Sequence, residues 1–156
     1  MKILYICTHN RCRSILSEAI TNSIAGDVIN AKSAGSQPAG IVHPLSLKYL
    51  AQTRYSTDGL QSQSWDNFED FHPDVVVTVC DSAAGESCPL YFGNSLKVHW
   101  GLTDPSKLQG SETQIADAFK ATIEQIRKRV EQLSNINVDI KDKAAFKTAL
   151  TNLGAT

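Results

Sequence analysis

The sequence carries almost no excess charge and contains no long apolar run. Its 156 residues have a formal net charge of -1, so they offer no broad basic surface to nucleic acid or an anionic membrane. No stretch approaches the roughly 20 apolar residues that a transmembrane helix requires. The N-terminal apolar run is too short for a signal peptide, and no small-residue cleavage site follows it. We therefore expect a cytoplasmic protein that binds neither nucleic acid nor membranes.

Cysteine is scarce, and its arrangement does not predict a metal site. The four cysteines form no CxxC pair, and the four histidines lack ligand spacing to them. In a reducing compartment, such thiols are more often catalytic or metal-binding than structural crosslinks. The chain also lacks internal repeats and low-complexity segments, and its apolar content of 42% is ordinary for a globular chain. We expect one domain and a monomer.

Apolar runs and helical periodicities alternate along the chain. Strands are predicted at residues 2–6, 28–34, 75–79 and 96–100. Helices are predicted from an N-cap at Ser14 to about residue 26, from Pro44, and over 64–71, 113–133 and 141–153, with a loop over 81–93. This alternation predicts a single α/β domain over residues 1–156. Its core is a four-stranded parallel sheet with helices on both faces, and a C-terminal helical extension begins at about residue 134.

The most informative segment is residues 7–14, Cys-Thr-His-Asn-Arg-Cys-Arg-Ser, which follows the first predicted strand. Backbone N–H groups in such a loop, and at the start of the next helix, favour an anion. The guanidinium of Arg13 can bind two oxyanion oxygens at once. This positive environment should lower the pKa of Cys7 below its usual value of about 8.5, and the thiolate would then be a nucleophile.

The alternative for Cys7 is a small buried residue at a strand end. Its position at the first strand-to-helix turn favours the oxyanion site, because open α/β sheets bind ligands at the carboxyl ends of their strands. The candidate oxyanion-binding residues are Thr8, His9, Asn10, Arg11, Cys12, Arg13 and Ser14. We expect the side chain of Cys12 to point into the core; the alternative is that Cys12 is a redox partner of Cys7. Three further histidines show no relay pattern and are expected to be structural or exposed: His43, His72 and His99.

Further candidates follow the third and fourth predicted strands. Cys80 ends the third strand, Cys88 lies eight residues later, and Asp104 precedes Pro105 after the fourth. The carboxyl ends of parallel strands share one rim, so Cys80 and Asp104 should lie near Cys7. There the thiols can exchange disulfides, and the aspartate can protonate a leaving oxygen. The alternatives are incidental loop thiols, a zinc site without the usual spacing, and a turn aspartate.

Taken together, these segments resemble a known family. Residues 7–14 resemble the phosphate loop of low-molecular-weight protein tyrosine phosphatases and of the arsenate reductases built on the same fold. Further matches favour the reductases: residues 76–80 with 88–89, residues 99–105, and residues 33–35. The similarity extends over roughly residues 2–133.

The resemblance implies that the chain reduces arsenate to arsenite. Arsenate would bind in the loop against Arg13 and the backbone N–H groups. Cys7 would attack arsenic, and Asp104 would protonate the departing oxygen. Ser14 would hydrogen-bond to the Cys7 thiolate and stabilise it.

The resemblance also implies a relay of thiols that resets the enzyme. Cys80 would attack Cys7 and release arsenite, and Cys88 would then attack Cys80. Thioredoxin would reduce the resulting Cys80–Cys88 disulfide, and glutaredoxin with glutathione is the alternative donor. The spacing from Cys80 to Cys88 is one residue longer than in the best-known thioredoxin-coupled members, which leaves the choice of donor open.

Several loop and neighbouring residues depart from the family pattern. His9 and Arg11 stand where the family often has glycine and serine, and both add potential positive charge near the anion. Some members of the family bind potassium near the loop. Asn10, Glu18 and Ser33 match that potassium site, but Gln63 stands where the family has an aspartate. We therefore predict no tightly bound metal or cofactor.

Other functions remain open from the sequence. A low-molecular-weight phosphatase would use Cys7, Arg13 and an aspartate on phosphotyrosine without a redox pair. Its Asp-Pro would lie far later in the chain, before tyrosines that grip the substrate, whereas Ser106 and Lys107 follow Asp104-Pro105 here. A non-catalytic oxyanion-binding or redox-sensing module would bind anions without turnover.

Overall fold

Four parallel strands form the sheet at the centre of the molecule. The structure, a computed structural model, describes residues 1–85, 89–136, 139 and 141–155. The strands are β1 (Lys2–Ile6), β2 (Asn30–Ala34), β3 (Val75–Thr78) and β4 (Leu96–His99), in the spatial order β2-β1-β3-β4. All three pairings are parallel, which confirms the predicted sheet.

The register of the sheet brings the ends of the strands to one rim. Ile6 at the end of β1 lies opposite Ala34 of β2 and Thr78 of β3. Apart from Lys2 at the start of β1 and Thr78 at the end of β3, the side chains of these central strands are buried on both faces of the sheet, as expected for parallel strands. The chain therefore leaves β1 at Cys7 and β3 near Cys80 at neighbouring positions of the same rim.

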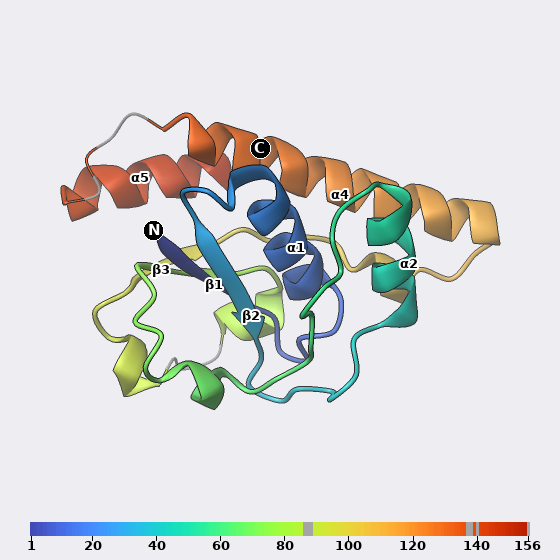
Figure 1. The fold of residues 1–156 in the computed structure, drawn as a ribbon, viewed down its shortest axis with the longest axis horizontal. Coiled ribbons are helices and arrows are strands. Elements are labelled where there is room, and N and C mark those ends of the chain that lie inside the picture. The colour runs from blue at the N-terminus through green and yellow to red at the C-terminus, as the bar shows by residue number, and fades with distance from the viewer. Residues whose placement is uncertain (86–88, 137–138, 140, 156) are drawn as a thin grey trace.

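Helices cover both faces of the sheet (Figure 1). The helices are α1 (Arg13–Ala25), α2 (Pro44–Gln52), α3 (Asp81–Ala84), α4 (Glu112–Ser134) and α5 (Lys143–Leu153), with 3-10 helices η1 (Trp65–Phe68), η2 (Leu90–Phe92) and η3 (Pro105–Lys107). On one face, Tyr5 of β1 hydrogen-bonds to Thr21 of α1. On the other face, the one-turn helix α3 contacts β3. Helices on both faces were predicted, but the long helices α1, α4 and α5 lie together on one of them.

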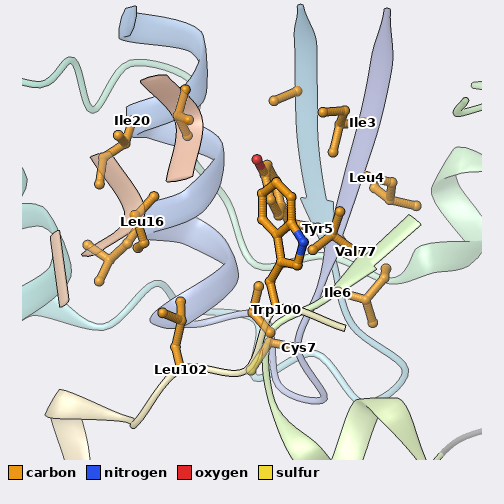
Figure 2. Packing of buried hydrophobic residues seen from close by; sticks show 14 of the residues in the cluster. Ile3, Leu4, Tyr5, Ile6, Cys7, Leu16, Ile20, Val77, Trp100 and Leu102 are labelled. Atoms are coloured by element: carbon orange, nitrogen blue, oxygen red, sulfur yellow. The ribbon is translucent and has the colours of Figure 1, made fainter. Parts of the chain in front are cut away.

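The core lies between the sheet and the long helices. Figure 2 shows Tyr5 and Trp100 between α1 and the strands, with Leu16 and Ile20 on the side of α1 that faces away from the strands. The rings of Tyr5 and Trp100 have centroids 6.5 Å apart. Since α1 is buried on both sides, it fixes the loop that precedes it. Among the helices of the described residues, none has both the length and the hydrophobicity to cross a bilayer.

Two predicted boundaries were wrong: the start of the first helix and the start of the second strand. The helix begins at Arg13 with Cys12 at the N-cap, so Ser14 is not the cap. The side chain of Ser14 is fully buried and accepts a hydrogen bond from Asn10 instead. The second strand begins at Asn30 and not at residue 28, because the N–H groups of residues 28 and 29 bond to the carbonyl that ends α1.

Helix boundaries elsewhere follow the local caps. Ser111 and Gln114 form a capping box that starts α4, and Ser64 caps η1 through its side chain. The predicted helix over 64–71 is therefore reduced to one 3-10 turn. The segment 81–93, which we predicted to be a loop, contains α3 and η2.

The C-terminal helix α5 contributes to the main core. Phe146 and Leu150 are buried in it. The indole N–H of Trp100 donates to the carbonyl of Leu150 over 2.8 Å. Arg129 of α4 donates to the carbonyls of Trp100 and Gly154, each over 3.2 Å. These contacts join α5 to the segment that leaves β4.

We predict that Leu150→Ala lowers the free energy of unfolding by about 2–4 kcal/mol, because it leaves a cavity beside Trp100. Lys147→Ala, at an exposed position of the same helix, should change it by less than about 0.5 kcal/mol. Urea denaturation at equilibrium measures both values. Equal effects of the two substitutions would mean that α5 does not pack as described.

Candidate active site

The loop that joins β1 to α1 holds its carbonyl groups outward. The carbonyl oxygens accept backbone N–H groups of residues 37–43, in the pairs Thr8–Gln37 (2.9 Å), His9–Ala39 (3.0 Å) and Arg11–His43 (2.9 Å). In a trans peptide the N–H group points away from the carbonyl, and the described chain has no cis peptide bond. The N–H groups of His9 and Cys12 therefore point toward the inside of the loop, where they favour an anion, whereas the N–H of Asn10 donates to the Cys7 carbonyl over 3.2 Å.

Asn10 stabilises the loop from within. It adopts a left-handed conformation, with φ of 45°, which asparagine tolerates better than most residues. Its amide nitrogen donates to the Ser14 hydroxyl over 2.8 Å, and its amide oxygen accepts the Gln63 N–H over 2.9 Å. Since Ser14 accepts from Asn10, its hydroxyl proton can be donated into the loop.

Gly35 allows β2 to approach the loop closely. A Cβ atom at this position would lie 2.4 Å from the carbonyl oxygen of Thr8 and 2.6 Å from that of Cys7. Both are backbone atoms, so the loop itself would have to move. The sequence identified residues 33–35 as a family match, and the structure gives the physical reason at Gly35.

The thiols of Cys7 and Cys80 are in direct contact. Both cysteines are free and buried. The Cys7 thiol donates a hydrogen bond to Cys80, and this bond, followed by burial, raises the pKa of Cys7. The sequence-based expectation of a lowered Cys7 pKa is therefore wrong for this conformation, because the nearby Arg13 has a smaller effect than the proton-sharing Cys80.

The contact with Cys7 has the opposite effect on the pKa of Cys80. Its pKa is lowered to about 5, first by the hydrogen bond from Cys7 and also by N–H groups of Thr8 and Ala83. Cys80 is the N-cap of α3, and the Ala83 N–H lies 3.4 Å from its sulfur. The Thr8 hydroxyl lies 3.8 Å from the same atom. Cys80 thus occupies the position of an anion at the start of a helix.

Arg13 and Asp104 form an ion pair at the edge of the loop. Nη2 of Arg13 lies 3.5 Å from Oδ2 of Asp104, and Nη1 donates to the Leu102 carbonyl over 3.1 Å. Oδ1 of Asp104 accepts the N–H and the hydroxyl of Ser106. Within the described residues, the buried Nε–H of Arg13 has no acceptor. An unsatisfied buried donor costs about 1–3 kcal/mol, so this N–H is suited to bind an anionic ligand.

The remaining loop side chains face other parts of the molecule. Cys12 lies in the core, and burial raises its pKa to about 11. Nδ1 of His9 lies 3.1 Å from the carbonyl oxygen of Gln37, on the exposed side of the loop. Arg11 is half-buried. The pKa of His43 is lowered, first by the burial of His43 itself and second by the positive charge of Arg11.

Two of the three residues that match the family's potassium site, Glu18 and Ser33, bond to each other. The Ser33 hydroxyl donates to Oε1 of Glu18 over 2.5 Å, and burial raises the pKa of this carboxyl. The amide oxygen of Asn10 accepts the backbone N–H of Gln63. In the part of the chain that the structure describes, no group of three or more His, Cys, Asp or Glu residues could hold a metal ion.

The structure brings most of the predicted site residues together. One loop and its immediate surroundings contain five of them: Cys7, Arg13, Ser14, Cys80 and Asp104. Figure 2 shows Cys7 and Leu102 beyond the same end of the strands. Residue Cys88 lies outside the described residues.

Sequence reasoning missed one polar group at this rim. Nε2 of His99 lies 3.1 Å from Oδ1 of Asp81, and Nδ1 lies 2.8 Å from the Thr78 hydroxyl. His99 is exposed, as predicted, but its two hydrogen bonds were not predicted, and residue 81 lies in α3 and not in a loop. The available signal was that all three residues end or follow the strands that carry Cys80 and Asp104.

The fold and the loop together define a single α/β domain in which a loop of backbone N–H groups lies beside a buried cysteine. The family model for low molecular weight phosphotyrosine protein phosphatase matches residues 2–145. The chain belongs to this family.

Similar proteins within the family include arsenate reductases. Arsenate reductase 1 of Staphylococcus epidermidis is 37% identical over 129 residues, which are 82% of this chain and 96% of that protein. The arsenate reductase of Staphylococcus xylosus is 36% identical over 128 residues, 81% of this chain and 96% of that protein. A solved structure of a thioredoxin-dependent arsenate reductase from Corynebacterium glutamicum has a TM-score of 0.61 at 26% identity, and the match covers 85% of this chain and 62% of that one.

We predict that Gly35→Ala weakens the binding of inorganic phosphate about tenfold or more, because it displaces the loop that positions the N–H donors. Gly85→Ala is the matched control, since its Cβ atom would have no neighbour closer than 3.7 Å. Calorimetric titration gives both affinities, and circular dichroism verifies folding. Wild-type affinity in a folded Gly35→Ala protein would exclude this loop as the anion site.

We also predict that the reduced protein carries the thiolate of this pair on Cys80 at pH 7. Its absorbance at 240 nm should fall as the pH is lowered through about 5. In Cys80→Ala, Cys7 loses the acceptor of its proton and remains beside Arg13, so the pKa of Cys7 should fall. A low-pH thiolate signal that survives in Cys80→Ala and is absent from Cys7→Ala, with no change in its midpoint, would assign it to Cys7 instead.

Proposed function

We propose that this protein reduces arsenate to arsenite, with Cys7 as the nucleophile and Cys80 as the resolving thiol. The observation that carries the proposal is the hydrogen bond from the Cys7 thiol to Cys80 inside the oxyanion loop. A hydrolytic phosphatase needs one thiol, whereas a two-electron reduction needs two thiols in contact. The names of the staphylococcal relatives support the same reaction.

The first step is the formation of a bond between Cys7 and arsenic. Arsenate binds to the inward N–H groups and to the Nε–H of Arg13. The proton of Cys7 passes to Cys80 along their hydrogen bond, and the Cys7 thiolate attacks arsenic. One arsenic–oxygen bond breaks, and Asp104 donates a proton so that the oxygen departs as water. The Ser14 hydroxyl donates a hydrogen bond to the Cys7 sulfur and thereby stabilises the thiolate before the attack.

The second step is the reduction of arsenic. Cys80 loses its proton readily because N–H groups of Thr8 and Ala83 stabilise its thiolate. The Cys80 sulfur attacks the Cys7 sulfur, and the electron pair of the sulfur–arsenic bond remains on arsenic. Arsenic(V) becomes arsenic(III), arsenite leaves, and the two thiols are oxidised to a Cys7–Cys80 disulfide.

The final steps restore the Cys7 thiol. Cys88 attacks Cys80, so a Cys80–Cys88 disulfide forms and Cys7 is released. Thioredoxin then reduces this disulfide, which agrees with the name of the thioredoxin-dependent relative from Corynebacterium glutamicum. Glutaredoxin with glutathione is the alternative donor. Both systems belong to reducing compartments, and we place the protein in the cytoplasm.

Phosphotyrosine hydrolysis is the second candidate function. It is favoured by the family to which the chain belongs and by the proximity of Arg13 and Asp104 to Cys7. A cysteinyl-phosphate intermediate would then be hydrolysed by water, and Cys80 would not take part. The two functions are therefore separated by their dependence on the second thiol.

Oxidation of NADPH, coupled through thioredoxin reductase and thioredoxin, measures arsenate turnover. We predict that Cys7→Ser and Cys80→Ser each lower this turnover by about 10³-fold or more, since each removes a reacting atom. Hydrolysis of an aryl phosphate, where it occurs, should be lost in Cys7→Ser and retained in Cys80→Ser.

Cys88→Ser should release one arsenite per protein and then stop. Continued turnover of this variant at the wild-type rate with thioredoxin would contradict the proposed relay. Aryl phosphate hydrolysis by a protein that consumes no NADPH with either thioredoxin or glutaredoxin would favour the phosphatase.

A further inference from the structure

His99 connects β4 and β3 to the helix that follows Cys80. Its Nδ1 lies 2.8 Å from the hydroxyl of Thr78, and its Nε2 lies 3.1 Å from Oδ1 of Asp81, the first residue of α3. The ring rests against Gly101, where a Cβ atom would lie 3.0 Å from Nε2. The imidazole is therefore held from several sides at the rim that carries the site.

Helix α3 supplies a donor to the Cys80 sulfur. The N–H of Ala83 lies 3.4 Å from this sulfur, and the N–H of Ala84 donates to the Cys80 carbonyl over 3.2 Å. Both donors are in place only while residues 81–84 are helical. A helix of one turn is not stable by itself in water, so contacts with the rest of the molecule must maintain it.

Apolar packing holds α3 only partly. A cavity of about 420 Å³ is lined by Ala83 and Ala84 of the helix and by Val76, Thr78 and Lys97 of the strands, with His99 at the same surface. Of the four residues of α3, only Ala83 is buried. The bridge from His99, which lines this cavity, to Asp81 ties the first turn of α3 to the sheet.

We propose that His99 is a positioning residue, which acts through Asp81 to hold α3 in place and thereby keeps the Cys80 sulfur against Cys7. The role of Cys80 as the resolving thiol rests on the proposed function, but the positioning itself does not. Asp81 is fully exposed and His99 is partly exposed. The bridge is therefore a weak one, and its loss should slow the reaction of Cys80 with Cys7 roughly two- to fivefold.

The variants His99→Ala and His99→Gln test this role. Alanine removes the bridge, whereas the glutamine amide can donate to Asp81 in place of Nε2 without carrying charge. His72→Asn is the control: it removes a histidine that precedes β3 at the opposite end of the sheet, and asparagine suits its φ of 51°. Thermal denaturation verifies that all three variants remain folded.

Two measurements report on Cys80 without arsenate. The first is the pKa of Cys80, followed by the Cβ resonance of ¹³C-labelled cysteine and assigned with Cys80→Ser. The second is the rate at which the thiol oxidant diamide, itself reduced to a hydrazide, converts Cys7 and Cys80 to a disulfide. We expect a raised pKa and a two- to fivefold lower rate in His99→Ala, restoration towards wild type in His99→Gln, and no change in His72→Asn.

A double substitution completes the test. In an Asp81→Ala background, His99→Ala should have no further effect on the rate, because the bridge is already absent. Wild-type behaviour of His99→Ala, or equal changes in His99→Ala and His99→Gln, would overturn the positioning role and leave the proposed function intact. If the expected shifts appear but the wild-type protein does not reduce arsenate, the positioning role stands and the proposed function fails.

Discussion

The outward hydrogen bonds of the loop after β1 are the constraint on which the site depends. Residues 37–43 bind the carbonyls of Thr8, His9 and Arg11, so the N–H groups of His9 and Cys12 point toward the inside of the loop. Gly35 makes this possible because β2 ends against the carbonyls of Cys7 and Thr8. Helix α1, buried on both sides, then fixes Arg13 at its first turn. The proposed anion site is thus a property of the backbone, and side chains refine it.

Within this loop, the two thiols share one proton. The inward N–H groups would stabilise a thiolate on either sulfur, but Cys80 also receives the N–H of Ala83 at the start of α3. The pKa of Cys7 is consequently raised, and that of Cys80 lowered, in this conformation. Under the proposed function, an arsenate bound beside Arg13 would compete with Cys80 for donors of the loop. That competition would link substrate binding to the transfer of the Cys7 proton and would give each thiol its turn as nucleophile.

The sheet, and the rim that gathers the site, could be predicted from the sequence. Buried parallel strands such as residues 75–79 are apolar on both faces, and strand ends then place Cys7, Cys80 and Asp104 at one edge. The sequence could not tell which sulfur holds the proton, because that depends on donors a few ångströms away. It also missed α3 and its bridge to His99, since a helix of one turn leaves no periodic pattern.

The most direct test of the account is the disulfide that forms when arsenate is reduced once. Reduced Cys88→Ser protein is mixed with one equivalent of arsenate and no external reductant, alkylated, and mapped by mass spectrometry. The account predicts release of arsenite together with a disulfide between Cys7 and Cys80. Arsenite released with a disulfide between Cys7 and Cys12, and with Cys80 still alkylated as a free thiol, would contradict it.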